Sequence, residues 1–146
     1  MFVVRAMMIE PARFVAQTLS SQGDPVWEYR FAYVADSMKK QWPGAPHATE
    51  IPFVFDTVKA KYGAKLTPED EEIAQQTNEY WANFAKTGDP NGAGLPKWPR
   101  YNSKSDELMI IGPERVGAEA DPWKTRLDLT EKLASGEQNA SGKEAK

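Results

Sequence analysis

The hydrophobic and polar positions of the chain follow a strand-like period in some segments and a helical period in others. Residues 26–34, VWEYRFAYV, place an aromatic side chain at every second position, with Glu28 and Arg30 between them. This alternation predicts a strand with one apolar face. Residues 107–112, ELMIIG, predict a second, short strand. Residues 51–58, IPFVFDTV, are also apolar, but their periodicity does not decide between helix and strand.

The strongest helical pattern covers residues 67–88, TPEDEEIAQQTNEYWANFAKTG. Thr67 is a natural N-cap, Pro68 suits the first helical position, and Gly88 suits the end. The acidic residues 69–72 lie at the positive end of the helix dipole, which stabilises the start. One apolar face is predicted, formed by Ile73, Thr77, Tyr80, Trp81 and Phe84.

Two further helices are predicted near the ends of the chain. Residues 10–23 have Pro11 at the first helical position, and one face carries Phe14, Val15, Thr18 and Leu19. Residues 121–134 have Asp121 as the cap and align Trp123, Leu127, Thr130 and Leu133.

The segments between these elements are loops rich in glycine and proline, residues 41–50 and 89–101. Two strands separated by long connections do not make a stable sheet, because three or more strands or a covering partner are needed. The aromatic strand therefore predicts a larger sheet with strands supplied from elsewhere. No linker divides the chain, so residues 1–134 are expected to form one segment of a domain, and residues 135–146 a mobile polar tail.

Composition excludes several functional classes. The 146 residues include 5 Trp, 5 Tyr and 6 Phe, which argues against disorder. A net charge of -3 offers no basic patch for nucleic acid. Because there is no cysteine, disulfides, thiolate zinc sites and a cysteine nucleophile are excluded.

Membrane insertion and export find no support in the pattern. No apolar run approaches the roughly 20 residues that span a bilayer. Residues 1–14 are too short and too interrupted for a signal peptide, so an export signal is either absent or part of a longer parent chain. The compartment stays unassigned.

His47 is the only histidine, and it invites three interpretations. A metal site is the weakest, since zinc takes three or four protein ligands and the remaining donors would be carboxylates. A general base is chemically attractive, because histidine ionises near neutral pH and loops after strands often carry reactive groups. Without further information, an ordinary loop residue is the simplest interpretation.

The residues around His47 resemble a family motif. Residues 44–57, GAPHATEIPFVFDT, resemble the histidine loop of the type-B carboxylesterase/cholinesterase family of α/β-hydrolases, Gly-x-x-His-x-x-Glu-(Ile/Leu)-(Pro/Glu)-(Phe/Tyr)-Val-Phe. PARFVAQTLSSQGDPVWEYRFAYV before this loop, and YWANFAKTGDPNG, WPRY and ELMIIG after it, resemble the family in the same order. The resemblance covers about residues 7–130.

This resemblance implies a fold class and a function. The fold would be α/β, the C-terminal portion of an α/β-hydrolase sheet with few strands and flanking helices, incomplete as a stand-alone domain. The intact enzyme would hydrolyse small carboxylic esters through an acyl-enzyme, with no cofactor. His47 would be the base of a Ser-His-acid triad, and Glu50 would support the histidine loop.

The α/β-hydrolase chain order is serine, acid, histidine, so the resemblance implies that the serine and the acid precede this segment. No serine here has glycine at both the second position before and the second position after it, as a nucleophile elbow requires; the serines are 20, 21, 37, 103, 105, 135 and 141. The family's acid also lies upstream, which argues against a substitute among Asp24, Asp36, Glu50 and Asp56. The chain alone is therefore expected to be inactive.

The main partner expected is the missing N-terminal part of the hydrolase domain. The alternative function is a non-catalytic, cholinesterase-like binding or interaction module. An exposed sheet edge would invite self-association in either case.

Overall fold

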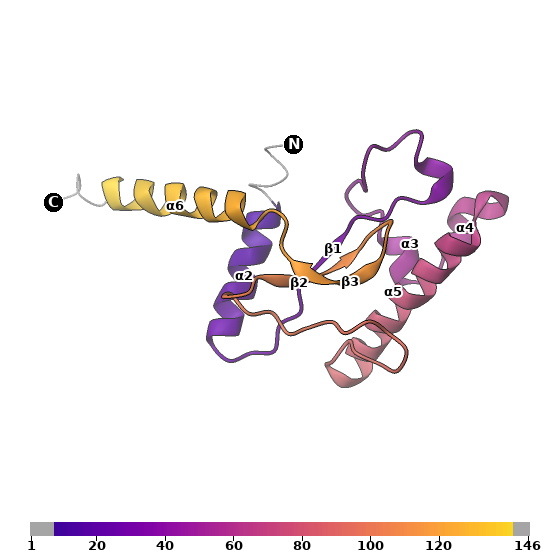
Figure 1. Cartoon of the computed structure of the whole chain (residues 1–146), viewed down its shortest axis with the longest axis horizontal. Helices are drawn as coiled ribbons and strands as arrows, with labels where there is room; N and C mark the ends of the chain where they lie inside the picture. The colour runs from indigo at the N-terminus through magenta and orange to yellow at the C-terminus, as the bar shows by residue number, and fades with distance from the viewer. Residues whose placement is uncertain (1–7, 142–146) are drawn as a thin grey trace. The chain divides into compact units, whose positions relative to one another are not determined.

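The computed structural model describes residues 8–141 of the chain, and of residues 134–141 only the backbone (Figure 1). The contacts divide it into two units. The first unit comprises the described residues up to Glu28, Arg100–Glu107 and those from Glu119 on, and the second comprises Tyr29–Pro99 and Leu108–Ala118. The elements in chain order are α2 Glu10–Ser21, β1 Tyr29–Phe31, the 3-10 turn η2 Asp36–Met38, α3 Ile51–Val54, α4 Val58–Tyr62, the 3-10 turn η3 Gly63–Lys65, α5 Pro68–Thr87, β2 Glu107–Ile111, β3 Val116–Ala120 and α6 Lys124–Ser141.

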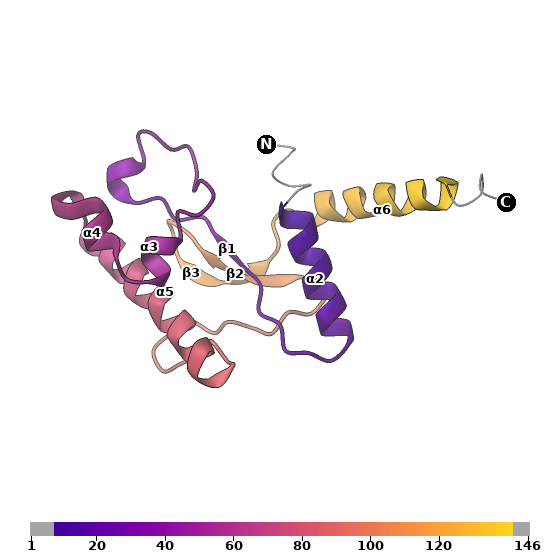
Figure 2. The ribbon, with the colours of Figure 1, turned by 180° about the vertical axis from the view of Figure 1, so that it is seen from behind.

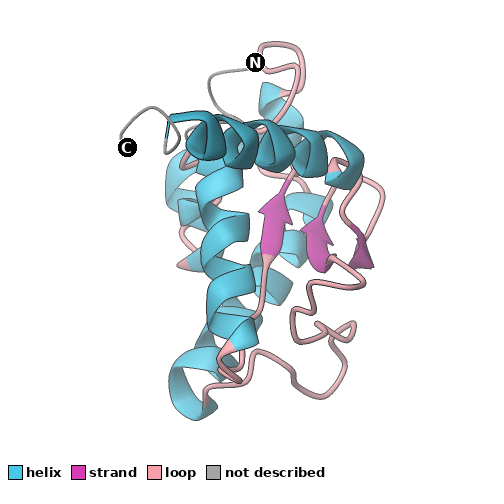
Figure 3. Ribbon diagram, turned by 90° about the vertical axis from the view of Figure 1, so that its left-hand side faces the viewer, coloured by secondary structure: helices cyan, strands magenta, loops and turns pink. Residues whose placement is uncertain are grey.

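The three strands lie side by side in one mixed sheet (Figure 3), and their order is β1-β2-β3. β1 runs parallel to β2, with Tyr29 opposite Met109 and Phe31 opposite Ile111. β2 and β3 are joined by only residues 112–115, a connection short enough for an antiparallel hairpin. The first two strands were predicted, whereas β3 was missed because its sequence, VGAEA, consists mostly of Gly, Ala and Glu, which are depleted in strands.

β1 is shorter than the predicted strand, residues 26–34, but its aromatic face is confirmed. A strand extends only as far as it pairs with a neighbouring strand, and β2 is the only strand beside β1 among the described residues. Tyr29, Phe31 and Tyr33 of the predicted strand nevertheless pack on α3 and α5. The ring centroids of Tyr29 and Trp81 are 4.9 Å apart, those of Phe31 and Phe53 are 5.1 Å apart, and those of Tyr33 and Phe53 are 5.5 Å apart.

α5 begins and ends as predicted. The Asp70 N–H donates to the Thr67 hydroxyl and the Thr67 N–H donates to the Asp70 carboxylate, which completes a capping box. Gly88 ends the helix with a φ of 75°, a conformation that glycine adopts without strain. α3, from the segment left undecided between helix and strand, lies against α5 (Figure 2).

The last helix, α6, begins at Lys124, two residues after the predicted first position, and follows a turn in which the Trp123 N–H donates to the Asp121 carboxylate at 2.7 Å. The predicted mobile tail, residues 135–146, begins inside this helix, and residues 142–146 lie outside the described part of the chain. Its mobility stays a prediction, as does the single segment predicted for residues 1–134. Within residues 8–141, no helix has the length and apolar character to cross a bilayer.

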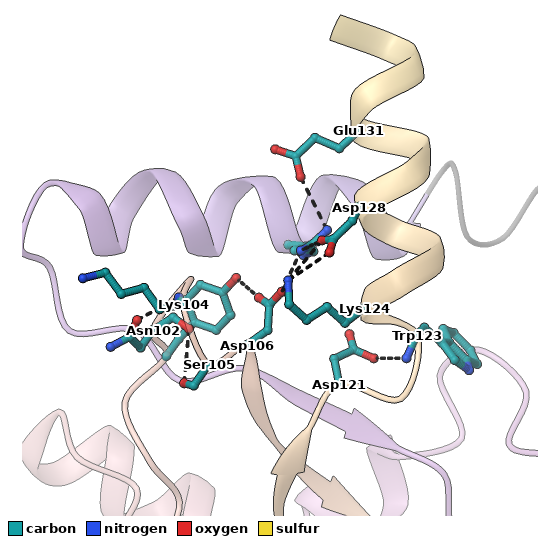
Figure 4. A network of polar contacts seen from close by, with 11 residues as sticks. Asn102, Lys104, Ser105, Asp106, Asp121, Trp123, Lys124, Asp128 and Glu131 are labelled. Atoms are coloured by element: carbon teal, nitrogen blue, oxygen red, sulfur yellow. Dashed lines mark hydrogen bonds and ion pairs between the residues drawn. The ribbon is translucent and has the colours of Figure 1, made fainter.

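In the first unit, α2 buries a polar side chain and exposes its apolar face. Arg13 is 3% exposed, whereas Phe14 is 67% exposed. The Arg13 guanidinium donates to Asp106 at 2.6 Å and also contacts Asp128 and, at 3.5 Å, Glu131 of α6 (Figure 4). A buried arginine needs such partners, because an unpaired charge is costly to remove from water.

Asp106 is the centre of this network. Its carboxylate accepts hydrogen bonds from Arg13 and from the Tyr101 hydroxyl, and the Lys124 ammonium lies 3.1 Å away. Burial alone would raise the pKa of Asp106, but the hydrogen bonds from Arg13, Tyr101 and Lys124 outweigh it and hold the pKa below its usual range. The network therefore joins α2, the segment before β2, and α6.

Replacing Arg13 is expected to destabilise the first unit strongly. Arg13→Ala leaves the buried Asp106 without its main partner, so the free energy of unfolding should fall by roughly 3–5 kcal/mol. Arg126→Ala, at an exposed position of α6, is the matched control and should change it by less than about 0.5 kcal/mol. Urea denaturation followed by circular dichroism measures both, and equal losses in the two variants would contradict the role of the network.

Candidate functional site

A tight turn presents His47. The Thr49 N–H donates to the Pro46 carbonyl at 3.3 Å, and the Thr49 hydroxyl donates to the same oxygen at 2.7 Å. Ala48 has a φ of 66°, whereas His47 does not have a positive φ. A positive φ at the third position but not at the second is the φ pattern of a type II turn, with His47 second and Ala48 third, a position that normally favours glycine. The position of His47 is therefore set by the backbone of the turn.

The turn leads directly into α3, which is anchored to α5. The Glu50 carbonyl accepts hydrogen bonds from the Phe53 and Val54 N–H groups, both at 2.9 Å. The Asn78 side chain of α5 donates to the Val54 carbonyl at 2.8 Å. Phe53 is buried beneath the loop, against the aromatic face of β1. The histidine loop is thus held on the long helix by backbone and side-chain contacts.

His47 lies on the wall of a cavity of about 700 Å³. The lining comes from the loop, α3, α4 and one of the three residues between these helices, and consists of Trp42, Pro46, His47, Ala48, Thr49, Ile51, Pro52, Thr57, Ala60, Lys61 and Tyr62. No serine and no carboxylate is among these residues. The cavity therefore offers a solvent-accessible imidazole beside apolar walls, but no serine nucleophile.

The carboxylates considered as substitutes for a triad acid lie elsewhere. In the second unit, Asp36, Glu50 and Asp56 are not among the residues that line the cavity. Asp36 instead forms an ion pair with Lys39 at 3.1 Å. Within residues 8–141, no group of three or more histidine, aspartate or glutamate side chains could hold a metal ion.

Glu50 is half-buried at the start of α3. Burial raises the pKa of Tyr29, and the negative charge of Glu50 raises it further. The Glu50 carboxylate therefore disfavours ionisation of the Tyr29 hydroxyl in β1. Its carbonyl supports the first turn of α3, as described above. Support of the histidine loop by the Glu50 side chain itself stays a prediction.

Asp70 is a supporting residue that the sequence pattern did not reveal. Its buried carboxylate accepts hydrogen bonds from the Tyr33 hydroxyl at 2.8 Å, the Asp36 N–H at 3.0 Å and the Thr67 N–H at 2.9 Å. Burial would raise the pKa of Asp70, but these hydrogen bonds hold it below its usual range. The start of α5 is thereby joined to the chain that leaves β1 and leads to the histidine loop.

The sequence contained half of this signal. Thr67 and the acidic residues after it predicted the start of a helix, and a carboxylate three residues after a threonine can complete a capping box. The long-range donors, Tyr33 and Asp36, belong to another element and carried no sequence signal.

Replacing Asp70 by asparagine should destabilise the second unit in a pH-dependent way. Asp70→Asn replaces a carboxylate that accepts several hydrogen bonds, so the free energy of unfolding at pH 7 should fall by about 1–3 kcal/mol. Because the folded pKa lies below the unfolded value of about 4, the carboxylate contributes stability above that pH and loses it as the pH falls through the folded pKa.

Urea denaturation of both proteins at pH 7 and at about pH 3 measures this difference, which should narrow at the lower pH. Glu71→Gln, at the exposed neighbouring position, is the control and should leave stability nearly unchanged. A difference that is the same at both pH values would show that ionisation of Asp70 does not stabilise the fold.

Glycine at position 48 should fit the turn better than alanine. The left-handed conformation costs a non-glycine residue roughly 1–2 kcal/mol, whereas glycine adds about 0.4–1 kcal/mol of unfolded-chain entropy. Ala48→Gly should therefore leave the free energy of unfolding unchanged or raise it by up to about 1 kcal/mol. Ala45→Gly, in the same loop but without a positive φ, should lower it. Equal losses in the two variants, measured by urea denaturation, would mean that Ala48 is unstrained.

Comparison with known proteins shows which family the chain resembles. A model of the carboxylesterase family matches residues 2–130. The chain is 36% identical over 115 residues to the cocaine esterase of Homo sapiens, an alignment that covers 77% of this chain and 20% of that protein. It is 38% identical over 114 residues to carboxylesterase 4A of Bos taurus, covering 73% of this chain and 20% of that protein. The chain thus spans about a fifth of the length of these relatives.

Proposed function

This chain belongs to the carboxylesterase family, and we propose that it supplies His47 as the general base of a serine ester hydrolase. The mixed sheet and its helices are accordingly a portion of an α/β-hydrolase fold, in agreement with the predicted fold class. The chain is the C-terminal part of that domain in this proposal. The serine and the acid come from the part of the domain outside this chain.

The observation that carries the proposal is the position of His47 on a backbone-defined turn at the wall of an apolar cavity. A general base has to be accessible to the reacting proton and held in a reproducible position. The type II turn and the anchoring of α3 to α5 meet the second condition, and the exposed imidazole meets the first. An apolar wall beside it suits the hydrophobic part of an ester substrate.

The chemistry follows from this position. His47 accepts the proton of the serine hydroxyl as the oxygen attacks the ester carbonyl, and the same proton goes to the departing alcohol. The acyl group stays on the serine. Water then attacks the acyl-enzyme, His47 takes its proton, and return of that proton to the serine releases the carboxylic acid. No cofactor takes part in either half-reaction.

Glu50 has a supporting role in this proposal. It lies three residues after His47, at the junction of the loop and α3, where its carbonyl already fixes the first helical turn. A carboxylate at that junction would restrict the loop and keep the imidazole aimed at the serine.

The main partner proposed is the remainder of the hydrolase domain. Among the described residues, one edge of β1 has no neighbouring strand, and large apolar side chains are exposed in both units. An open edge and exposed apolar groups favour association with further strands and helices. In the isolated chain, the same features would favour self-association.

A chimera tests the role of His47. Residues 2–130 would replace the matching segment of a related carboxylesterase, and hydrolysis of p-nitrophenyl butyrate would be measured. Because loss of a triad histidine removes both general-base and general-acid catalysis, His47→Ala should lower kcat by about 10³-fold or more. Gln41→Ala, at an exposed position of the same loop, is the control and should retain activity. The isolated chain should show no saturable, His47-dependent turnover.

Labelling of the chimera with a fluorophosphonate separates the alternatives. If His47 activates the serine, His47→Ala should slow labelling, while Gln41→Ala should not. A chimera that folds and binds substrate but is neither active nor labelled with His47 intact would favour the non-catalytic binding module.

A further inference from the structure

We propose that the cavity beside His47 selects the part of an ester that combines a ring-sized apolar group with a negative charge, and that Lys61 determines this selectivity. The inference rests on the proposed function, because it assigns the cavity of that site to substrate binding. It adds the substrate class and a specificity-determining residue, neither of which follows from the role of His47.

The walls of the cavity are suited to an apolar ring. Trp42 and Tyr62 contribute aromatic side chains, and the aliphatic part of the lining comes from Pro46, Ala48, Ile51, Pro52 and Ala60. A volume of about 700 Å³ lies within the usual range for ligand pockets and accommodates an aromatic group. Binding of an apolar ring against such a lining is favourable, because it removes apolar surface from water.

The charge of the cavity is one-sided. Lys61 contributes the only ammonium group among the lining residues, and no carboxylate lines the cavity. The surrounding residues 50–66 contain Lys59, Lys61 and Lys65 against Glu50 and Asp56, although the whole chain has a net charge of -3. A positive group without a nearby acid in the lining attracts an anion and disfavours a cation.

Lys61 is free to meet a ligand. The ion pairs of Lys39 with Asp36 and of Lys124 with Asp128 show how other lysines of this chain are engaged. No such ion pair of Lys61 occurs among the described residues. Its backbone N–H donates to the Thr57 carbonyl at 3.1 Å, at the start of α4. A lysine can lay its methylene stem along an apolar wall and keep its ammonium in water. The cavity thus combines an apolar interior with a cationic group.

The single histidine provides a direct assay on the full chain. The imidazole C–H signals of His47 are the only histidine signals in a ¹H–¹³C NMR spectrum, and His47 lines the cavity. Three probes with one aromatic ring would be titrated at fixed pH and ionic strength: phenylacetate, 2-phenylethanol and benzyltrimethylammonium. Phenylacetate should shift these signals saturably, with a Kd about two- to fivefold lower than that of 2-phenylethanol, as expected for one exposed ion pair. The cation should bind more weakly than the alcohol.

Two charge-removing variants make the assay specific. Lys61→Gln should abolish the preference for phenylacetate over 2-phenylethanol while leaving binding of the alcohol unchanged. Lys59→Gln, two residues away on α4 but not part of the lining, should retain the preference. Equal loss in the two variants, no preference for the anion, or no binding of any probe would overturn the inference.

The result is independent of the catalytic test. Charge selectivity that depends on Lys61, together with a His47→Ala chimera that stayed active, would support anion binding in the cavity and reject the proposed function. Conversely, a His47-dependent chimera without charge selectivity would support the proposed function and reject the role of Lys61.

Discussion

The buried carboxylate of Asp70 is the interaction on which the arrangement of the site depends. It satisfies the N-cap of α5 and, at the same time, accepts hydrogen bonds from Tyr33 and Asp36, on the segment that leaves β1. The histidine loop follows that segment and leads into α3, which is tied to α5 again through Asn78. Both ends of the segment that carries His47 are therefore hydrogen-bonded to α5. A base on a loop can be positioned reproducibly only when its scaffold is held in this way.

Local rules predicted much of the fold. The capped helix α5 and the alternating aromatic strand follow from residues close together in the sequence, and both are confirmed. The features that were not predicted are those that depend on residues distant in the sequence. β3 is stabilised as a strand by pairing with β2, and Arg13 is buried because it pairs with Asp106, which lies far from it in the sequence. The local pattern of apolar and polar residues therefore predicts neither feature.

The candidate site was predictable to a similar extent. The loop around His47 was recognised from its motif, and the family it indicated is shown by the match over residues 2–130. The cavity was not predictable, because its lining combines the loop with α4, and the path between them depends on the turn around Asp56, where φ is positive. The type II turn at Ala48 was hidden for a different reason, since alanine gives no sign of a position that normally favours glycine.

We propose that the turn at Pro46–Thr49 already holds His47 in the position of a base, and that its triad partners come from outside this chain. A crystal structure of the chimera, with a phosphonate bound covalently to its serine, tests this most directly. The His47 Nε2 atom should lie within about 3.2 Å of the serine Oγ or the oxygen that replaces the leaving alcohol, with a carboxylate at Nδ1. An imidazole directed away from the serine, with the turn at Pro46–Thr49 unchanged, would contradict a role of His47 as the base.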